Sequence, residues 1–470
     1  MELFGQYDVV VVGAGVTGVV AAIRSARQGA RTLLLEDSGV LGGLVTGGRL
    51  TKPQGLVNGG VFAELFDRCA GYNGADTTIR HADFGAYTSA FDSEVMQRVI
   101  IEVIEEANVE VLLRAKVVGV LRDGENLLGL EIYTKSGRKL VLAKVVIDSS
   151  GDGDVAALSG AEFVIGRKED GLTQPISSYF RVLNVDVPAL VADCKAHPED
   201  MVHVILPDNA GTRNEDFIMS VLICGFAERL RKAKEQGFKW IIPRNNLILK
   251  TGLIPGEINL NVTRVHGNAL DDRVLSRAEI EVRKQAYCAL DFLKRYVRGF
   301  ENAIFLDIAA KLGVRETRRI KGKYVLTGAE VRGQTRFEDA IGLCNSPIDI
   351  HDPAGDKLVV NNIGSGYGIP YRCLLPEKIK NLLVAGRCIS VDEIALSSSR
   401  NIPGCAITGE AAGIAAALCS MRGITPSALP VGDVQSILRK QGVILGTPGD
   451  DFPDVLVRLP SDAIAKPLMV

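Results

Sequence analysis

Three arginines stand close together in the second half of the chain, in the stretch KLGVRETRRIKGKYVLTG. Arg315, Arg318 and Arg319 lie within five positions. A guanidinium group is planar and permanently charged, and it can bind a carboxylate or a phosphate through two hydrogen bonds. The cluster therefore suits either an anionic ligand or carboxylates of the protein itself, such as Glu316 and Asp339, that would anchor one domain to another. The residues alone leave both alternatives open.

A set of glycines follows the first apolar run of the chain, in YDVVVVGAGVTGVVAAIRSARQGARTLLLED. The segment predicts a β-α-β unit, with a valine-rich strand, a tight turn, an alanine-rich helix and a second strand that Glu36 closes. Gly13, Gly15 and Gly18 have the G-x-G-x-x-G spacing, which permits close approach of the backbone to a pyrophosphate and tight packing of helix on strand. Glu36 is placed to accept hydrogen bonds from a ribose diol. The pattern indicates a dinucleotide site, and the alternative is a generic α/β unit with structural glycines.

Two further glycine turns favour FAD over NAD. After Glu36 the chain continues as DSGVLGGLVTGG, and Gly42 and Gly43 stand where an extended FAD needs close approach of the backbone. An NAD domain usually continues at once into a crossover helix. Later, DSSGDGDVAALSGA places Gly151 and Gly153 at the end of a buried strand, which suits a second contact with the cofactor. The alternative for this last turn is a simple connection from strand to helix.

The composition is that of a globular protein with two or three domains. The 470 residues include 47% hydrophobic and 23% charged residues, and 54 basic residues stand against 56 acidic ones. This balance gives no field for nucleic acid or an anionic membrane, and no run of about 18 apolar residues predicts a membrane span. The nine cysteines never form C-x-x-C, which argues against zinc, iron–sulfur clusters and disulfides. We expect a cytoplasmic protein without a metal, a leader or a nucleic-acid partner.

The remainder of the first domain shows a helix and several strands. FDSEVMQRVIIEVIEEAN predicts a core helix with Asp92 as its N-cap. From residue 109 onward, alternating apolar and polar residues around two glycine turns predict a three-stranded meander. A separate buried strand is expected at residues 145–147.

The pattern changes between residues 162 and 345. In GEINLNVTRV, Asn259, Asn261 and Thr263 alternate with apolar residues, so this strand has one polar face that either lines a pocket or faces water. SRAEIEVRKQAYCALDFLKRYV predicts a long amphipathic helix. No nucleotide motif occurs here, and the segment predicts an α+β substrate domain inserted into the first domain.

After residue 345 the chain returns to α/β character. IKNLLVAGRCIS predicts a buried strand and a glycine turn, and NIPGCAITGEAAGIAAALCSMRG predicts a helix whose small residues permit close packing. A helix that begins at Pro403 and Gly404 would aim its N-terminal amides and positive dipole end at the electron-rich edge of a reduced flavin. The predicted division of the chain is a FAD-binding domain at 1–161 and 346–430, a substrate domain at 162–345 and a C-terminal extension at 431–470.

Seven motifs together resemble the FAD-dependent oxidoreductases with a glutathione-reductase-type FAD domain, which are related to the succinate dehydrogenase and fumarate reductase flavoproteins. In chain order they are VVVVGAGVTG, GVLGGLVTGG, DSSGDGDVAALSGA, GEINLNVTRVHG, LGVRETRRIKGKYVLT, NLLVAGRCIS and SSSRNIPGCAITGEAAGIAAAL. They extend over nearly the whole chain and resemble a bacterial branch of the family. The resemblance implies an α/β fold, with a Rossmann-like FAD-binding domain of the ββα type and an inserted α+β cap. It also implies noncovalent FAD, because GGLVTGGRLTKPQG has no histidine for covalent attachment.

The resemblance also implies individual cofactor contacts. Val117 would present backbone groups to adenine, Asp152 would lie near the pyrophosphate, and Arg387 would reach the ribitol and phosphate region. Related flavoproteins more often carry an acidic residue at the position of Arg387. The full set of residues that the resemblance places around FAD is Gly13, Gly15, Val16, Thr17, Gly18, Glu36, Asp37, Gly42, Gly43, Leu44, Val117, Gly151, Asp152, Gly386, Arg387, Gly404 and Ala406.

Candidate catalytic residues follow from the same resemblance. In related structures the end of the cap lies over the flavin, so Arg315 and Arg318 are expected at the active site, where they would orient an anionic or carbonyl-bearing substrate and help proton transfer. Arg400 stands where fumarate reductases have an arginine for a substrate carboxylate. His266 is a further candidate for proton transfer, against the alternative of a hydrogen-bonded structural histidine. Other side chains that could lie near the flavin are His81, Tyr87, Tyr367 and Cys405, the last as an inert thiol.

Three functions are compatible with these motifs. The first is a dehydrogenase or oxidase in which noncovalent FAD takes a hydride from a small organic substrate and passes electrons to a separate acceptor. The second is a flavin-dependent reductase of an activated C=C bond, fed by a separate donor. The third is a flavoprotein whose FAD has a non-redox or structural role. The absence of a second G-x-G-x-x-G unit argues against a disulfide reductase with two nucleotide domains.

Overall fold

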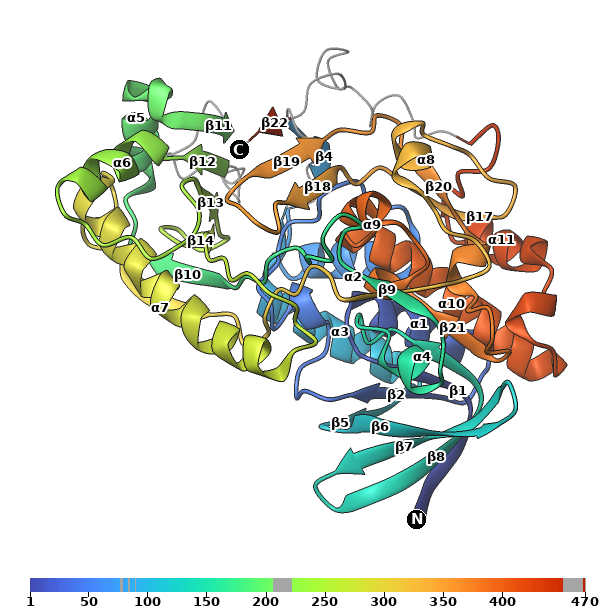
Figure 1. Cartoon of the computed structure of the whole chain (residues 1–470). Coiled ribbons are helices and arrows are strands. Elements are labelled where there is room, and N and C mark those ends of the chain that lie inside the picture. Colours follow the sequence, from blue (N-terminus) through green and yellow to red (C-terminus); the bar gives the residue numbers. More distant parts are fainter. Residues whose placement is uncertain (77–78, 83–84, 89, 206–221, 451–467, 470) are drawn as a thin grey trace.

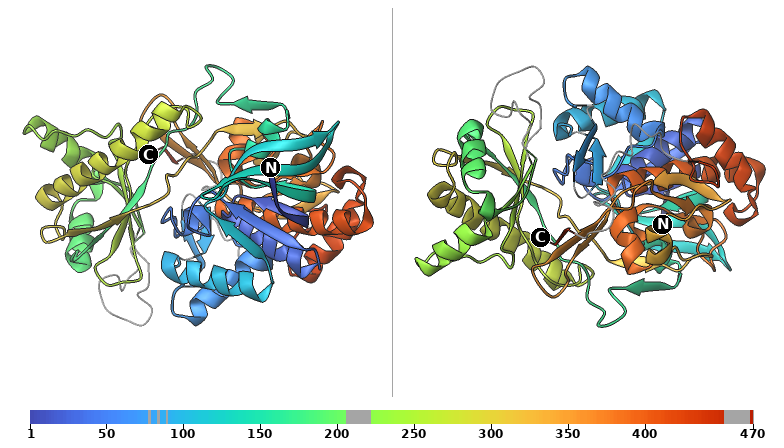
Figure 2. Two further views of the ribbon diagram at one scale, coloured as in Figure 1. Left: turned by 90° about the horizontal axis from the view of Figure 1, so that it is seen from below. Right: turned by 90° about the horizontal axis from the view of Figure 1, so that it is seen from above.

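The computed structural model describes residues 1–76, 79–82, 85–88, 90–205, 222–450 and 468–469. Two bodies of mixed α/β structure lie beside each other (Figure 1). The larger body combines the N-terminal segment with the C-terminal part of the chain, and the smaller body is formed by the middle of the chain. The same arrangement is visible from below and from above (Figure 2).

One sheet forms the centre of the larger body, in the order β5-β2-β1-β8-β7-β6 with β21 beside the end of β8. The neighbouring strands β5, β2, β1, β8 and β21 are parallel, whereas β6, β7 and β8 form an antiparallel meander. This arrangement confirms the predicted Rossmann-like α/β fold. The strands are β1 (Glu2–Val12), β2 (Thr32–Glu36), β5 (Glu110–Leu113), β6 (Lys116–Asp123), β7 (Asn126–Thr134), β8 (Gly137–Asp148) and β21 (Leu382–Val384).

The long strand β8 belongs to both parts of this sheet. Residues 137–142 pair with β7, and residues 139–148 pair with β1. The predicted meander is confirmed, but the separate strand expected at residues 145–147 is wrong, because these residues are the uninterrupted end of β8. No glycine, proline or turn residue stands between Leu140 and Ile147 to end the strand.

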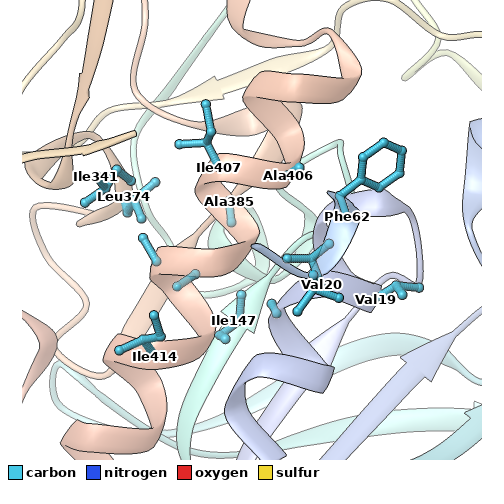
Figure 3. Close-up of a cluster of buried hydrophobic side chains, with 14 of the residues drawn as sticks. Val19, Val20, Phe62, Ile147, Ile341, Leu374, Ala385, Ala406, Ile407 and Ile414 are labelled. Atoms are coloured by element: carbon cyan, nitrogen blue, oxygen red, sulfur yellow. The ribbon is translucent and has the colours of Figure 1, made fainter. Parts of the chain in front are cut away.

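Helices α1 and α10 pack together on the sheet. A Cβ atom on Gly409 of α10 would lie only 2.5 Å from the carbonyl oxygen of Thr17 in α1, so the absence of a side chain permits this close contact. Apolar side chains from α1, α10 and β8 meet in one buried cluster (Figure 3). The helices of the larger body are α1 (Val16–Arg27), α2 (Gly60–Gly71), α3 (Ser93–Glu106), α4 (Asp154–Leu158), α8 (Gly328–Arg332), α9 (Glu393–Ser399), α10 (Ile402–Arg422) and α11 (Val431–Lys440).

Two of these helices bear on predictions from the sequence. Helix α3 begins after Asp92, whose side chain accepts hydrogen bonds from the backbone N–H groups of Glu94 and Val95, so the predicted N-cap is confirmed. Helix α10 has the length and hydropathy of a membrane span, but 94% of its 18-residue apolar window is buried inside the protein. Its apolar surface is therefore covered by the core of the larger body.

The smaller body consists of an antiparallel sheet, whose strands do not follow the chain order, with helices packed on it. The strand order is β11-β12-β13-β14-β10-β15, and Phe180, Leu260 and Phe292 belong to the core that this body buries. Helix α7 confirms the predicted long amphipathic helix. The elements are β10 (Tyr179–Leu183), α5 (Val187–Ala196), β11 (Met201–Ile205), β12 (Leu222–Gly225), α6 (Ala227–Glu235), β13 (Leu247–Thr251), β14 (Ile258–Asn261), α7 (Asp272–Tyr296) and β15 (Ile304–Ile308).

Short strand pairs complete the structure. They are β3 (Ile79–Ala82) with β4 (Gly85–Thr88), β9 (Phe163–Ile165) with β16 (Arg318–Ile320), β17 (Ala340–Cys344) with β20 (Tyr367–Pro370), and β18 (Ile348–His351) with β19 (Leu358–Asn361), which also pairs with β22 (Leu468–Met469). The β18–β19 hairpin lies between the two bodies (Figure 1). Ile341 and Cys344 pack in the core of the larger body. The division of the chain at residues 161, 345 and 430 stays a prediction.

Candidate cofactor and substrate site

The first glycine turn forms an open cradle between β1 and α1. Gly13 has a φ of +93°, and a Cβ atom there would lie 2.6 Å from the carbonyl oxygen of Ser149, so this position requires glycine. Gly18 is pressed against the carbonyl group of Gly13. By contrast, a Cβ atom on Gly15, the N-cap of α1, would meet no atom within 4 Å. The free space beside the first turn of α1, where backbone N–H groups are unpaired, fits a pyrophosphate.

The second glycine turn is held against this cradle by the backbone. Gly42 N–H donates to the carbonyl oxygen of Ala14 at 2.7 Å, and Gly42 forms a parallel bridge with Gly15. A Cβ atom on Gly43 would lie 2.9 Å from the Cα atom of Gly15. Both Gly42 and Gly43 have positive φ angles, of 90° and 59°. The two glycine loops therefore form one surface without side chains, which can accept an extended cofactor.

Glu36 ends β2 beside this surface and is 2% exposed. Its Oε2 atom accepts a hydrogen bond from Ala14 N–H at 2.7 Å, and its Oε1 atom accepts from Ser38 Oγ at 2.6 Å. Lys311 Nζ, which follows the last strand of the smaller body, lies 3.2 Å from Oε1. Burial acts to raise the pKa of Glu36, but the charge of Lys311 and the hydrogen bonds outweigh it and lower the pKa to about 2. Sequence reasoning missed Lys311, because only the fold brings it to Glu36.

A charged cluster surrounds the third glycine turn. Asp152 Oδ1 accepts hydrogen bonds from Arg387 Nη2 and from Thr317 Oγ1, both at 2.6 Å. Burial acts to raise the pKa of Asp152, but Arg387 and Thr317 outweigh it and hold the pKa below its usual range. Gly151 lies beside Arg387, since a Cβ atom there would be 3.0 Å from Arg387 Nη2. The structure thus brings Gly151, Asp152 and Arg387 together.

The other predicted cofactor residues have the following positions. Gly386, with a φ of +81°, faces Thr17, and its N–H donates to Thr408 Oγ1 at 2.9 Å. Gly404 lies in the first turn of α10 against the carbonyl group of Ser399. The remaining residues of this set are distributed over several elements. They are Val16 and Thr17 in the first turn of α1, Asp37 after β2, Leu44 directly after Gly43, Val117 in β6 and Ala406 in α10.

A cavity of about 160 Å³ lies between the two bodies. The larger body contributes the loop of residues 44–54, Arg387 and the start of α10, and the smaller body contributes β10, β12, β13 and β14. The β18–β19 hairpin and residues 313–315 complete the wall. The start of α10 therefore lies at the cavity, and its expected position at the flavin stays a prediction.

Two of the predicted arginines meet in this cavity. Arg315 Nη1 donates to the carbonyl oxygen of Pro175 at 2.6 Å, and Arg400 Nη2 donates to the carbonyl oxygen of Asp349 at 2.7 Å. Burial, together with repulsion from Arg400, lowers the pKa of Arg315 to about 9. His351 Nε2 lies 3.3 Å from Asp349 Oδ1. Arg315 and Arg400 thus share a buried space with one carboxylate.

The cavity has an excess of positive charge. Among the described residues that line it, Asp349 supplies the one carboxylate, whereas the cations are Lys52, Lys250, Arg315, Arg387 and Arg400. Burial would raise the pKa of Asp349, but His351, Arg400 and Arg315 hold it well below its usual range. Among the described residues that line the cavity, Arg400 Nε, Asn261 Oδ1 and Asp349 Oδ1 are buried without a hydrogen-bond partner. Unpaired buried polar atoms are costly, so the Arg400 donor fits an anionic group and the two oxygens fit a donor group of the same ligand.

The third predicted arginine takes another position. Arg318 Nη1 donates to the carbonyl oxygen of Asp152 at 3.0 Å and to Asp154 Oδ1 at 2.9 Å, and its guanidinium lies over the ring of Phe163. Arg318 is not among the described residues that line the cavity. Successive residues of β16 point to opposite sides, and the pairing with β9 directs Arg318 toward α4.

Arg319 fits the alternative in which the arginines of the cluster pair with carboxylates of the protein itself. It is 5% exposed, donates to Gly166 O at 2.8 Å and forms a buried ion pair with Glu316. Asp339 does not pair with any of the three arginines among the described ion pairs; its partner is Arg372, at 2.8 Å. The cluster therefore divides between the cavity and an anchoring role.

The remaining candidates lie away from the cavity or outside the described side chains. His266 Nδ1 lies 2.7 Å from the carbonyl oxygen of Pro353, and His266 is not among the described lining residues. Tyr367 is fully buried, and its hydroxyl donates to Ser398 Oγ at 3.0 Å. Burial raises the pKa of the Cys405 thiol to about 11, so it is uncharged near neutral pH. The side chains of His81 and Tyr87 lie outside the described residues.

Sequence reasoning missed Asp349 and His351, which both face the cavity from β18. The signal was present in IDIH, where two polar residues alternate with two isoleucines as in a strand with one polar face. The similar pattern at Asn259 and Asn261 was recognised, but its position was left open. Both asparagines are buried, at 3% and 8% exposure, and Asn261 lines the cavity.

The comparison with protein families decides the class of this protein. A family model described as FAD dependent oxidoreductase matches residues 8–438. The chain belongs to this family. FAD is therefore the cofactor of this FAD-dependent oxidoreductase, in agreement with the side-chain-free surface formed by the two glycine loops. Within the described residues, no cluster of three or more His, Cys, Asp or Glu side chains could hold a metal ion.

Individual proteins are similar to parts of this oxidoreductase. Digeranylgeranylglycerophospholipid reductase 1 of Methanococcoides burtonii is 28% identical over 154 residues, which are 31% of this chain and 38% of the archaeal protein. The tRNA uridine 5-carboxymethylaminomethyl modification enzyme MnmG of Bacillus licheniformis is 77% identical over 31 residues, 7% of this chain and 5% of that protein. Each alignment thus spans less than half of the relative's length.

Solved structures with a similar arrangement have low sequence identity. A geranylgeranyl bacteriochlorophyll reductase-like protein from Thermoplasma acidophilum has a TM-score of 0.47 at 12% identity, over 98% of this chain and 95% of that chain. The p-nitrophenol 4-monooxygenase PnpA from Pseudomonas putida DLL-E4 has a TM-score of 0.46 at 14% identity, over 94% and 85% of the two chains.

Proposed function

We propose that this FAD-dependent oxidoreductase transfers a hydride between noncovalently bound FAD and an anionic small molecule held by Arg400 and Arg315, with a separate electron acceptor. The observation that carries this proposal is the meeting of both arginines in a cavity that is also lined by the loop of residues 44–54, which follows directly on Gly42 and Gly43. FAD, when bound, supplies the hydride chemistry. The protein supplies binding, orientation and proton transfer.

Cofactor binding is assigned to the three glycine turns. Gly13 and Gly18 permit the tight turn, Gly15 leaves room for the pyrophosphate at the N-terminus of α1, and Glu36 is close enough to this cradle to bind the ribose. Gly42 and Gly43 would contact the part of the cofactor that extends toward the cavity. The remaining contacts assigned to FAD are those of Val16, Thr17, Asp37, Leu44, Val117, Gly151, Asp152, Gly386, Arg387, Gly404 and Ala406.

The two cavity arginines have different roles in this proposal. Arg400 is held by the backbone and carboxylate of Asp349, at 2.7 and 3.5 Å, so its guanidinium is fixed and can orient a substrate anion. Arg315 lines the same cavity as Arg400, where burial and the charge of Arg400 lower its pKa. We assign proton transfer to Arg315. Arg318 and His266 are left outside this mechanism because neither lines the cavity.

A reductase is the second candidate, because the archaeal relative with 28% identity is named as a reductase. In that direction the same arginines would bind an unsaturated anion, and Arg315 would donate the proton. The substrate end of the cavity does not distinguish the two directions, since hydride transfer in either sense needs the same orientation.

Anaerobic absorption spectra of the purified protein during titration with NADH or NADPH test the direction. An oxidised flavin spectrum that stays unchanged supports the dehydrogenase or oxidase, and screening then begins with hydroxy acids and other anionic donors. Bleaching by the nicotinamide instead supports the reductase. A protein that purifies without flavin and does not bind added FAD contradicts the cofactor assignment.

The role of Arg400 is tested by Arg400→Ala. We expect the variant to keep its flavin spectrum but to lose at least ten-fold in the rate of flavin reduction by an anionic donor, or of flavin oxidation by an anionic acceptor. Arg372→Ala is the control, because Arg372 pairs with Asp339 outside the described cavity lining. Equal rates for Arg400→Ala and the native protein would contradict the proposal.

A further inference from the structure

In the sheet of the smaller body, one row of side chains that line the cavity changes from apolar to polar along its length. The register places Cys224, Ile248, Asn261 and Tyr179 side by side on the adjacent strands β12, β13, β14 and β10. All four line the cavity. The row thus begins with a thiol and an aliphatic side chain and ends with an amide and a phenol. Asn261 Nδ2 donates to Tyr179 Oη at 3.2 Å, which fixes the polar end.

The opposite wall has the same change of character. In the β18–β19 hairpin, Asp349 is paired with Val360 and His351 with Leu358, and all four residues line the cavity. The polar strand β18 contacts Arg400 through Asp349. The neighbouring strand β19 presents two aliphatic side chains, each 5% exposed. Two walls from separate parts of the chain therefore each have a polar strand and an apolar strand.

The apolar residues that these strands contribute to the cavity are Leu222, Cys224, Ile248, Leu358 and Val360, and we call this set the apolar half. It does not include residues from the loop of residues 44–54 or from the start of α10, which belong to the larger body. Leu222 and Cys224 come from the same strand, β12, so the apolar half has a continuous edge. A small anion without an apolar part would leave this half in contact with water, and burying apolar surface there stabilises a complex by about 25 cal/mol per Å².

We infer that the substrate is an amphiphilic anion, whose charged group lies at Arg315 and Arg400 and whose aliphatic or aromatic body lies in the apolar half. This inference rests on the proposed function for the anionic end and adds the apolar body to it. Lys250 does not interrupt the apolar half, because its ammonium group lies over the ring of Tyr179, 5.6 Å from the centroid, at the polar end.

Calorimetric titration of the FAD-loaded protein with unbranched carboxylates tests the inference without measuring turnover. The probes are butyrate, hexanoate and octanoate, used below their micelle concentrations, with 1-octanol as the uncharged counterpart. Each buried methylene contributes about 0.8 kcal/mol, so we expect roughly four-fold tighter binding per added methylene and roughly 200-fold between butyrate and octanoate. We expect 1-octanol to bind at least ten-fold more weakly than octanoate.

The variant Ile248→Ser places a hydroxyl in the apolar half. We expect butyrate to bind it as it binds the native protein, whereas octanoate loses about ten-fold in affinity. Leu358→Ser on the opposite wall gives a second test if the first variant fails to fold. The control is Ile304→Ser, which changes an isoleucine that is 55% exposed on β15.

The outcomes distinguish a failure of the apolar half from a failure of the proposed anion site. Butyrate and octanoate of equal affinity would overturn the amphiphilic substrate but leave the anion site intact. Tight binding of octanoate and 1-octanol alike would overturn the anionic end, and with it the proposed role of the arginines. A chain-length dependence that persists unchanged in both serine variants would place the apolar body elsewhere and overturn the inference.

Discussion

Gly15 stands at the N-terminus of α1 with open space where a side chain would be. Gly13, two positions earlier, is required for a different reason, because its φ is +93° and the backbone of Ser149, directly after β8, is in contact with it. Two glycines of one motif are therefore required for different reasons. The fold requires Gly13, and the expected ligand requires Gly15. Substitution at each should have a different consequence.

For the ligand-facing glycine we predict that Gly15→Val removes FAD binding while the protein still folds. The valine side chain would enter the space of the pyrophosphate but would meet no protein atom within 4 Å at its Cβ. The measurement is the ratio of flavin to protein absorbance after purification, together with the far-ultraviolet circular dichroism. Gly71→Val at the end of α2 is the control, because a Cβ atom there also meets nothing within 4 Å and its φ is not positive. A fully yellow Gly15→Val protein would contradict the assignment.

At the scale of elements, α1 and α10 approach each other because α10 has glycine where it crosses α1. Gly409 and Gly413 face the backbone of Thr17 and Ala21. This contact places the start of α10 next to the cofactor cradle at the start of α1. Gly409 and Gly413, which lower the helix propensity of α10, are therefore part of how the two helix N-termini are brought together.

Gly409→Ala should destabilise the protein, because its new Cβ atom would lie 2.5 Å from the carbonyl oxygen of Thr17. Overpacking of this kind costs about 1–3 kcal/mol. The matched variant Gly432→Ala, in the first turn of α11, meets nothing within 4 Å and should be neutral or slightly stabilising. Denaturant unfolding of both variants gives the comparison. If the two variants have equal stability, the close packing of α1 and α10 is not required.

At the scale of the whole molecule, the segment that leaves the smaller body divides its charged residues among three tasks. Lys311 reaches Glu36 beside the first glycine turn, Arg315 faces the cavity, and Arg319 pairs with Glu316. Lys311 N–H also donates to the carbonyl oxygen of Gly47 at 3.1 Å. One short segment therefore ties the smaller body to the larger body and contributes Arg315 to the cavity between them.

We predict that Lys311→Met destabilises the protein at pH 7 by about 1 kcal/mol, a value kept low because Lys311 is partly exposed. The pKa of Glu36 is about 2 in the folded protein against an ordinary value of 4.5, so its contribution is present above pH 4.5 and is lost as the pH falls toward 2. The difference between variant and native protein should therefore shrink between pH 4.5 and 2.

Urea unfolding at pH 7, 5 and 3 measures this dependence. Lys321→Met is the control, because Lys321 pairs with Glu162 between side chains that are both 47% exposed. A destabilisation by Lys311→Met that stays constant down to pH 3 would mean that the ion pair with Glu36 does not cause it.

The sequence by itself determined the local elements and the cofactor. Spacing and periodicity are local properties, so Gly13, Gly15 and Gly18, the N-cap Asp92 and the long helix α7 could be predicted from neighbouring residues. The family resemblance added FAD, which the family match confirms. The prediction of a separate strand at residues 145–147 was wrong, because no local signal separates one long strand from two short ones.

Only the tertiary structure decided which side chains meet. Arg315 and Arg318 are three positions apart, yet one faces the cavity and the other contacts Asp152 and Asp154, because β16 begins between them and pairs with β9. Asp349 and His351 join the arginines from a hairpin more than thirty positions later. Contacts between such distant residues depend on how the two bodies pack, and sequence patterns carry no information on that packing.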